Sequence, residues 1–478
     1  MIWKLALLGI IAKVSLLLFW TYWRTRVSII PVLVEFEHFA NDVANTSGAL
    51  ADQFPSVLVV SDTLPYPPVQ LPAAARLHLT APDIDVPLLE RVHRGLTPSS
   101  HVLVLPDFVR VSDAGRLAAL ATAQLSAMVA LPVGAVQCER VRLDVRRWTL
   151  EYSPAAEGGP CDAVSGRHGL LLPTALLWRL AEPFCRPAPE CLYVQTARAR
   201  LPVVLSPSGL LAPAPVELTQ RQRQKLRQYR EHRWDALLRL LEVRRVVRAG
   251  RSQWHGCTRD SARCFPSLVD DTPDYLHRGR WTPPCCLRHL RHTARHVLRA
   301  LTVCGARHWL EGGSLLGAVR SGDIIPWDSD VDVGMYLDDV PGCAPLRDAV
   351  KRPVVDEQGF VWEKAPEGRF FRVQFSAQNR IHVDIFPFYS RNGTMTKDTW
   401  FATHRQDCEF PEHYLTPLET LPFVGVNASV PNRARQFLEL KFGPGVVENP
   451  QYPQPSVLAL RAERPGDVDM NDPWRDEL

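Results

Sequence analysis

The stretch from Trp309 to Met335 constrains this chain more than any other, because it ends in three aspartates at alternate positions. In a strand the side-chain period is two, so Asp328, Asp330 and Asp332 would project from one face. Like charges on one face repel one another unless a cation lies among them. Mg2+ takes oxygen ligands, commonly one or two carboxylates together with substrate phosphates. The stretch therefore predicts a site for magnesium and a nucleotide.

The same stretch begins with a glycine turn, Gly312-Gly313-Ser314, followed by an apolar helix start. Glycines let a backbone approach phosphates closely, because they carry no Cβ. Such a turn followed by D-x-D-x-D is typical of the nucleotidyltransferase fold. That fold needs another acidic residue on a neighbouring strand, and IHVDIF supplies Asp384. We predict that Asp384 is the general base or a further metal ligand.

Length and charge limit what the rest of the chain contributes. At 478 residues the chain is longer than one core usually serves, which predicts two soluble domains. Its 55 basic and 51 acidic residues nearly balance, so composition gives no support to nucleic acid as a partner. The 41 prolines between short apolar runs favour a loop-rich α/β chain.

An arginine-dense connecting helix over 217–248 is predicted to carry a solvated charged face and to end near the domain boundary.

The first domain, 24–250, reads as alternating short strands and helices. It contains no glycine-rich phosphate loop and no carboxylate cluster, which favours a structural or acceptor-recognising stem over a catalytic domain. Strands are predicted at Ser56–Ser61, His101–Leu105 and Cys191–Gln195, and a helix at Arg116–Val129. Cys138 with Cys161, and Cys185 with Cys191, are candidate disulfides in an oxidising compartment.

The N-terminus carries an apolar run, residues 5–23, that is just long enough to cross a bilayer. We predict a signal anchor with residues 1–4 in the cytosol and the rest in the lumen, and a cleaved signal peptide is the alternative. Asn45, in the sequon Asn-Thr-Ser, is our candidate glycosylation site. The chain ends in RDEL, which resembles an endoplasmic reticulum retrieval signal.

Four cysteines precede the glycine turn: Cys257, Cys264, Cys285 and Cys286. Four thiolates suit a tetrahedral structural zinc site. The spacing is not that of two C-x-x-C knuckles, and two disulfides explain the same residues equally well in a secretory compartment. From the residues alone, both alternatives stay open for the loop 257–286.

The segments GGSLLGAVRSGDIIPWDSDVD and HVDIFPFY resemble the LicD group of phosphotransferases. RWTPPCCLR, FVWEK, NGTMTKDTW, FPEHY and FLELKFGPGVVENPQYP resemble, within that group, the family of ribitol 5-phosphate transferases. The resemblance extends over Cys257–Pro453, with a looser echo in SDTLPYPP of the first domain, and departs from the family at the anchor and at the RDEL end. It implies a glycosyltransferase-like α/β stem joined to a LicD catalytic domain over 251–478.

The resemblance also implies an activity. Members transfer ribitol 5-phosphate from CDP-ribitol to the ribitol-phosphate-capped O-mannosyl glycan of α-dystroglycan, as type II proteins of the Golgi membrane that form homo-oligomers. It implies that the four cysteines bind structural Zn2+ and that the aspartates bind catalytic Mg2+. The remaining alternatives are a LicD-type enzyme that uses another CDP-alcohol, such as CDP-glycerol or CDP-choline, and a non-catalytic lumenal scaffold that only binds nucleotide.

Carried over by position, the resemblance assigns residues to the donor site. Asp328, Asp330 and Asp332 would hold Mg2+ against the diphosphate, and Arg320 suits a phosphate because its fork is bidentate and permanently charged. The other predicted donor-site residues are Gly313, Trp327, Ser329, Val331, Gln406, Asp407, Asn449, Pro450 and Gln451.

Overall fold

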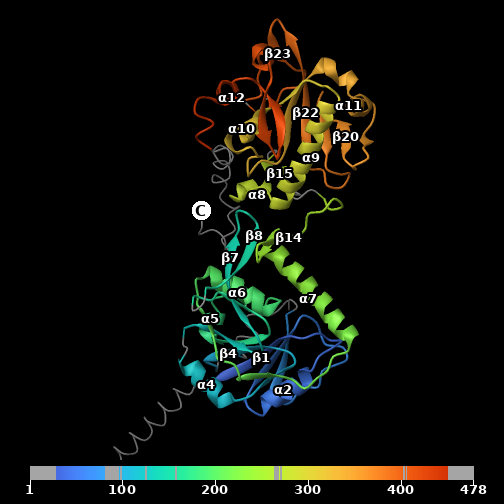
Figure 1. The fold of residues 1–478 in the computed structure, drawn as a ribbon. Helices are drawn as coiled ribbons and strands as arrows, with labels where there is room; N and C mark the ends of the chain where they lie inside the picture. Colours follow the sequence, from blue (N-terminus) through green and yellow to red (C-terminus); the bar gives the residue numbers. More distant parts are fainter. Residues whose placement is uncertain are drawn as a thin grey trace, which may run out of the picture. The chain divides into compact units, whose positions relative to one another are not determined.

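The computed structural model describes residues 28–80, 96, 99–123, 126–156, 159–262, 268–269, 272–401, 404 and 406–450. The chain forms two compact units. Unit 1 consists of residues up to 143 together with 151–241 and 248–250, and unit 2 consists of 144–150, 242–247 and the residues from 251 onward. Helices and strands mix in both units, which confirms the predicted α/β class (Figure 1).

Unit 1 is built on a seven-stranded sheet of order β11-β6-β10-β4-β1-β2-β3. Strand β10 is antiparallel to β4 and β6, and the other pairs are parallel. The central strands read as continuous apolar runs because helices and loops cover both faces of a parallel sheet. The strands are β1 (Ile29–Glu35), β2 (Val57–Ser61), β3 (Ala75–Leu79), β4 (His101–Pro106), β6 (Met128–Pro132), β10 (His168–Pro173) and β11 (Val203–Leu205). The predictions for β2 and β4 are confirmed.

The helices of unit 1 differ from prediction at two segments. The predicted helix Arg116–Val129 is confirmed only as far as Ala123, because the apolar run that begins at Met128 is buried as strand β6 of the sheet. The CLYVQ segment, predicted as a strand, lies within α6 (Ala188–Arg198), whose first turn contains a proline and Glu190. Proline and an acidic residue both favour a helix N-terminus, and they outweigh the β-propensity of the short apolar run. The other helices are α2 (Val43–Ala51), α4 (Ala114–Ala123), α5 (Thr174–Leu177) and α7 (Gln220–Leu240).

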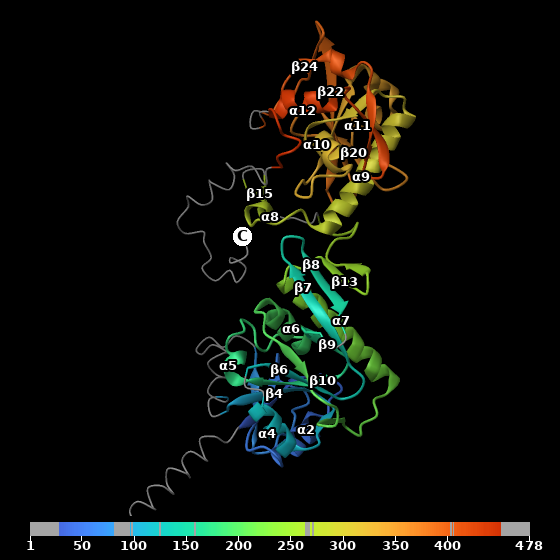
Figure 2. The ribbon, with the colours of Figure 1, turned by 60° about the vertical axis from the view of Figure 1, so that its left-hand side comes forward.

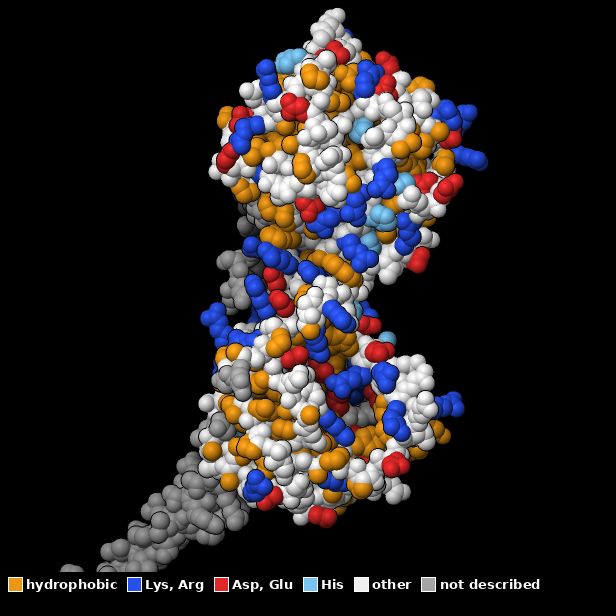
Figure 3. All heavy atoms as spheres, in the orientation of Figure 1, with side chains coloured by type: hydrophobic (Ala, Val, Ile, Leu, Met, Phe, Trp, Pro, Cys, Tyr) orange, Lys and Arg blue, Asp and Glu red, His pale blue; other side chains and the backbone are white. Residues whose placement is uncertain are grey.

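The arginine-dense helix α7 begins at a capping box between Thr219 and Gln222. The predicted range 217–248 is too long, because the helix ends at Leu240 and Arg245–Arg248 form strand β13. The prediction of a solvated charged face is wrong in part, because Arg230 pairs with Glu190 at 2.7 Å and Arg233 pairs with Glu37 at 2.8 Å. The helix is therefore part of unit 1. On the face drawn in Figure 3, acidic and basic side chains of the described residues are interspersed.

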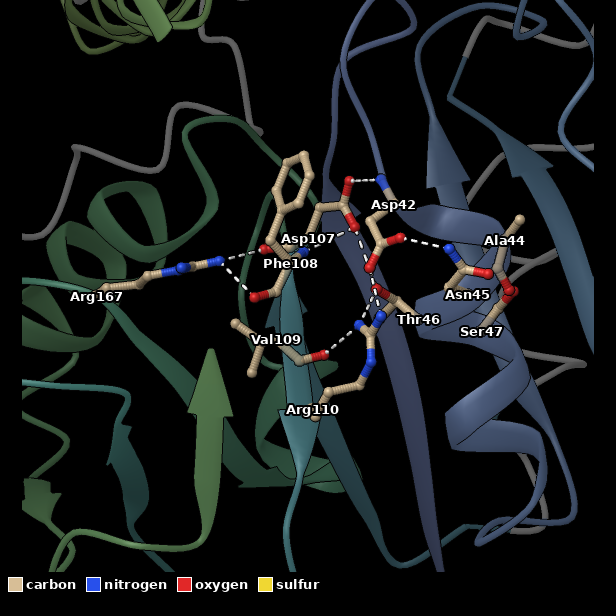
Figure 4. Close-up of polar contacts among 10 residues, drawn as sticks. All are labelled: Asp42, Ala44, Asn45, Thr46, Ser47, Asp107, Phe108, Val109, Arg110 and Arg167. Carbon is tan, nitrogen blue, oxygen red and sulfur yellow. Dashed lines mark hydrogen bonds and ion pairs between the residues drawn. The ribbon is translucent and has the colours of Figure 1, made fainter. Parts of the chain in front are cut away.

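Figure 4 shows how the first turn of α2 is held. The Asp42 N–H donates to Asp107 Oδ2 at 2.7 Å, and the Asp42 carboxylate pairs with Arg110. Burial raises the pKa of Asp107 to about 6. Asn45, the predicted glycosylation site, is exposed on this turn, and its amide donates to Asp42 Oδ1 at 2.7 Å. Its glycosylation stays a prediction.

The smaller strands form two further sheets and carry one of the predicted disulfides. Strand β12 (Leu211–Pro213) pairs with β5 (Val109–Val111). A five-stranded sheet has the order β14-β13-β8-β7-β9, with β7 (Gln137–Asp144), β8 (Thr149–Pro154), β9 (Ala163–Ser165), β13 (Arg245–Arg248) and β14 (Arg251–Trp254). A disulfide joins Cys138 to Cys161, and another joins Cys185 to Cys191, as predicted.

Unit 2 is built on an eight-stranded sheet. Its main path is β17-β18-β22-β21-β20-β19, and β22 pairs in addition with β23, which pairs with β24. Only β18 and β22 are parallel to each other among the pairs of this sheet that the structure describes. The strands are β17 (His308–Leu310), β18 (Val331–Tyr336), β19 (Val354–Val355), β20 (Val361–Lys364), β21 (Phe371–Gln374), β22 (His382–Arg391), β23 (Thr394–Thr396) and β24 (Phe410–Pro411).

Helices cover this sheet. The long helix α9 (Pro284–Val303) packs on β21 and β22, and α10 (Gly312–Ser321) packs on β18 and on α12 (Ala434–Phe442). Figures 1 and 2 both show α9 near β22 and α10 beside α12. The remaining elements are α8 (Asp274–His277), α11 (Ala344–Ala349), the 3-10 helices η1 (Leu337–Gly342) and η2 (Glu412–Leu415), and the hairpins β15 (Leu268–Val269) with β16 (Thr272–Pro273) and β25 (Glu419–Phe423) with β26 (Val426–Val430).

Several sequence predictions fall on parts of the chain outside the described residues. These are the anchor over 5–23 with its cytosolic tail 1–4, the RDEL end, Cys264 and Gln451. None of the helices in the described ranges combines the length and the apolar character that a bilayer crossing needs.

Candidate active site

The three alternating aspartates do not all lie in one strand. Strand β18 begins at Val331, so Asp332 lies in the strand and Asp328 and Asp330 precede it. A turn closed by the Asp328 N–H and the Ile325 carbonyl, 2.9 Å apart, bends the chain just before the strand. The predicted strand therefore starts later than the D-x-D-x-D pattern suggests.

The aspartates nevertheless converge on the glycine turn. A Cβ built on Gly313 would lie 2.7 Å from Asp328 Oδ2, and one on Gly312 would lie 3.3 Å from Asp332 Oδ2. Gly312 also has a φ of 53°, which side chains disfavour. The Ser314 hydroxyl accepts from the Asp332 N–H at 2.9 Å and ties the turn to β18. The Asp328 carboxylate thus occupies space that a side chain at residue 313 would need, and residue 312 has a backbone conformation that favours glycine.

The site is strongly acidic. Burial and the neighbouring Asp330 carboxylate raise the pKa of both Asp328 and Asp332 well above the ordinary value. Lys397 acts on Asp332 in the opposite direction. A nearby cation would stabilise the charged form of such carboxylates. No three His, Cys, Asp or Glu side chains of the described residues stand ready to hold a metal ion by themselves. Mg2+ needs fewer, since it commonly binds one or two carboxylates and completes its shell with phosphates and water.

Asp384 lies where the sequence predicted, on the strand next to Asp332. The two residues are register partners in the parallel pair β18 and β22. Asp384 is buried, and both of its oxygens accept hydrogen bonds from Arg372, at 2.9 Å each. Burial lowers the pKa of Arg372, but the hydrogen bonds and negative charges of Asp384 and Glu367 together outweigh burial, and the net shift is upward. The role of Asp384 as a base stays a prediction. The structure adds that the Arg372 guanidinium is its direct neighbour.

A second buried ion pair supports the glycine turn. Glu311, directly before Gly312, pairs with Lys441 of α12, and both residues are buried. The other Glu311 oxygen accepts from the Trp309 indole at 2.8 Å. This pair could not be predicted from the sequence, because charged residues 130 positions apart show no periodic relation.

The predicted residues 406 and 407 lie in a loop beside another buried lysine. Asp407 pairs with Lys397 at 2.8 Å and accepts from the Phe401 N–H at 2.9 Å. The Lys397 ammonium also lies 4.1 Å from the Phe386 ring centroid. The Asp407 carboxylate therefore holds the loop, and Gln406 is half-buried next to it.

The other predicted donor-site residues contact different parts of the protein. Arg320 donates to the backbone carbonyls of Val446 and Val447, which ties α10 to the C-terminal segment. The Asn449 amide donates to the Gly445 carbonyl at 3.0 Å. These side chains contact protein groups, and their roles in donor binding stay predictions. Trp327 and Ser329 are half-buried, Val331 is fully buried and Pro450 is exposed.

The described cysteines before the turn, Cys257, Cys285 and Cys286, form disulfides in the structure. A disulfide joins Cys257 to Cys285, and Cys286 is also disulfide-bonded. All three residues are buried in the core of unit 2. Zinc binds thiolates, so this arrangement is the alternative to the predicted zinc site rather than that site itself.

Comparison with known proteins identifies the class first. The nucleotidyltransferase domain described as LicD/FKTN/FKRP matches residues 305–433, which include the glycine turn, the aspartates and Asp384. The fukutin-related protein stem domain matches residues 22–249. The fold and site therefore define a transferase with a nucleotidyltransferase-type domain.

Curated relatives narrow the class to a family. "Ribitol 5-phosphate transferase FKRP" of Mus musculus is 48% identical over 91% of this chain and 90% of its own length. The Homo sapiens protein of the same name is 48% identical, with 90% of each chain covered. "Ribitol-5-phosphate transferase FKTN" of Homo sapiens is 26% identical and covers 32% of this chain and 33% of its own length. The chain belongs to the fukutin-related protein family.

Proposed function

We propose that this enzyme transfers ribitol 5-phosphate from CDP-ribitol to the ribitol-phosphate-capped O-mannosyl glycan of α-dystroglycan and releases CMP. The observation that carries the proposal is the convergence of Asp328 and Asp332 on the turn of Gly312 and Gly313. Carboxylates beside a bare backbone turn form a place for a metal-bound diphosphate. The names of the relatives supply the ribitol phosphate.

The carboxylates fit Mg2+ in their chemistry, and Asp328, Asp330 and Asp332 would hold it. When bound, magnesium supplies positive charge that offsets the diphosphate and the leaving CMP. The glycine turn brings backbone close to the phosphates. The acceptor hydroxyl attacks the phosphorus of ribitol 5-phosphate, so that one P–O bond forms as the P–O bond to CMP breaks. The Asp384 carboxylate receives the hydroxyl proton.

A donor panel tests this proposal. We expect the lumenal portion of the protein, incubated with a ribitol-phosphate glycopeptide, to release CMP from CDP-ribitol at least about 10-fold faster than from CDP-glycerol or CDP-choline, because those donors lack hydroxyls that a specific site would bind. The glycopeptide should gain the mass of one ribitol phosphate. Faster release from another CDP-alcohol would reassign the donor. Binding of CDP with no release of CMP would leave only the scaffold alternative.

The same proposal includes the protein's surroundings. It includes a type II protein of the Golgi membrane with the catalytic domain in the lumen and with homo-oligomeric assembly, as the resemblance to the family implies and as the apolar run over 5–23 suggests.

We also propose that the reduced cysteines of the loop 257–286 bind structural Zn2+. Cys257, Cys285 and Cys286 are of the right type and are buried near one another, with Cα atoms of Cys257 and Cys285 5.8 Å apart. We expect protein purified without chelators to carry one zinc per chain by elemental analysis, and Cys285→Ser to lose it. Protein without zinc in which these cysteines resist alkylation before reduction would contradict the proposal and leave the disulfides.

A further inference from the structure

A row of charged residues crosses the centre of the catalytic sheet. Arg372 of β21 is the register partner of Asp384 in β22, and Asp384 is the register partner of Asp332 in β18. Directly opposed residues of neighbouring strands project to the same side of a sheet. The row therefore places a guanidinium, a carboxylate and the acidic site beside one another in that order.

The contact between Arg372 and Asp384 is two-pronged. Nε donates to Asp384 Oδ1 and Nη2 donates to Oδ2, at 2.9 Å each. Nη1 donates to Glu367 Oε1 at 2.9 Å and so fixes the far side of the fork. The Arg372 side chain is 16% exposed and that of Asp384 is 8% exposed. A planar fork held at both ends orients the carboxylate that it binds, which a lysine ammonium cannot do.

We propose that Arg372 is a positioning residue for the transfer reaction, and that its guanidinium sets the orientation of the Asp384 carboxylate at the site. This inference rests on the proposed function, since it concerns the residue that receives the acceptor proton. A carboxylate has lone pairs beyond the two that face the guanidinium, so Asp384 keeps a place for the acceptor hydroxyl.

Electrostatics gives Arg372 a second effect. Asp328, Asp330, Asp332 and Asp384 together would place four carboxylates around one site. By pairing with Asp384, Arg372 leaves the other three carboxylates to share the bound cation. Without Arg372, Asp384 would be a buried carboxylate without its guanidinium partner beside Asp332, and it would be free to turn toward the metal.

The test compares Arg372→Lys with Arg372→Gly. We expect Arg372→Lys to keep the charge but lose the fork, and to lower kcat by on the order of 100-fold with KM for CDP-ribitol changed little, since misplacement of a reacting group has that effect. Arg372→Gly should lose more activity. Free guanidinium, far below concentrations that unfold proteins, should restore part of its kcat, whereas ammonium should not.

Arg369 provides the matched control. It lies near the same strand and pairs with Asp398 at 3.1 Å, but its side chain is 75% exposed. We expect Arg369→Gly to keep wild-type kcat and to be indifferent to guanidinium. Wild-type kcat in Arg372→Lys, or a folded Arg372→Gly that guanidinium does not rescue, would overturn the inference. Absence of transfer by the wild-type enzyme would instead contradict the proposed function, so the two failures are distinct.

Discussion

Asp332→Asn is expected to lower the rate of ribitol phosphate transfer by on the order of 100- to 1,000-fold, comparable to the loss of one group that stabilises transition-state charge. The same change is expected to raise the stability of the metal-free protein. Burial, Asp330 and Asp384 together raise the pKa of Asp332, which means that its charged form is costly in the folded state. Asparagine removes that cost while keeping the backbone hydrogen bond to Ser314.

The measurement combines transfer rates with thermal unfolding in the presence of a chelator and of Mg2+. Without metal, the thermal unfolding midpoint of the variant should rise by about 2–4 °C for each kcal/mol of added free energy of unfolding. Mg2+ should stabilise the wild type and have little effect on the variant. Asp348→Asn, at an exposed aspartate of α11, is the control and should alter neither quantity. A wild-type transfer rate in Asp332→Asn would contradict the assignment of Asp332 to the site.

Lys441→Met is expected to destabilise unit 2 by roughly 3–5 kcal/mol, the usual result of removing one partner of a buried ion pair. It leaves the buried Glu311 carboxylate without its cation directly before the glycine turn. Activity should fall as well, because Glu311 also holds the Trp309 indole and the Gly312 N–H. Thermal unfolding and transfer assays measure the two effects.

A double variant separates charge from packing. Glu311→Gln combined with Lys441→Met removes both charges and should recover most of the lost stability, because no buried charge is left unpaired. Arg435→Met is the control on the same helix, since Arg435 pairs with Glu448 at the surface and its loss should not change the unfolding midpoint. If Arg435→Met destabilised the protein as much as Lys441→Met does, the loss would come from substitution anywhere in α12 rather than from breaking the buried pair.

Local patterns predicted much of the framework. The apolar runs of β2 and β4 and the strand of Asp384 are short-range signals, and the structure contains all three elements. The adjacency of Asp332 and Asp384 followed from the expectation of a neighbouring acidic strand. The helix α6 was mispredicted as a strand because its apolar run of four residues, Cys191–Val194, fits both periods.

The supporting charges could not be predicted in the same way. Arg372 and Asp384 are 12 residues apart on antiparallel strands, and Glu311 and Lys441 are 130 apart. No periodicity in a sequence pairs a particular arginine or lysine with a particular acid across such distances. The partners of Arg320 are also distant in the chain, because its guanidinium donates to the carbonyls of Val446 and Val447, and its role at the donor site stays a prediction.

The contact between Glu311 and Lys441 has a consequence for how the protein is made. A ribosome adds residues one by one, at about 5–20 per second, and a domain folds as a unit once its parts have emerged. Glu311 and the glycine turn are synthesised well before α12, so Glu311 has no Lys441 to pair with until 130 further residues have been added. A chain that stops short of Lys441 would contain every aspartate of the site and still present a carboxylate with no counterion. We expect cellular protein quality control to recognise such a chain as incompletely folded.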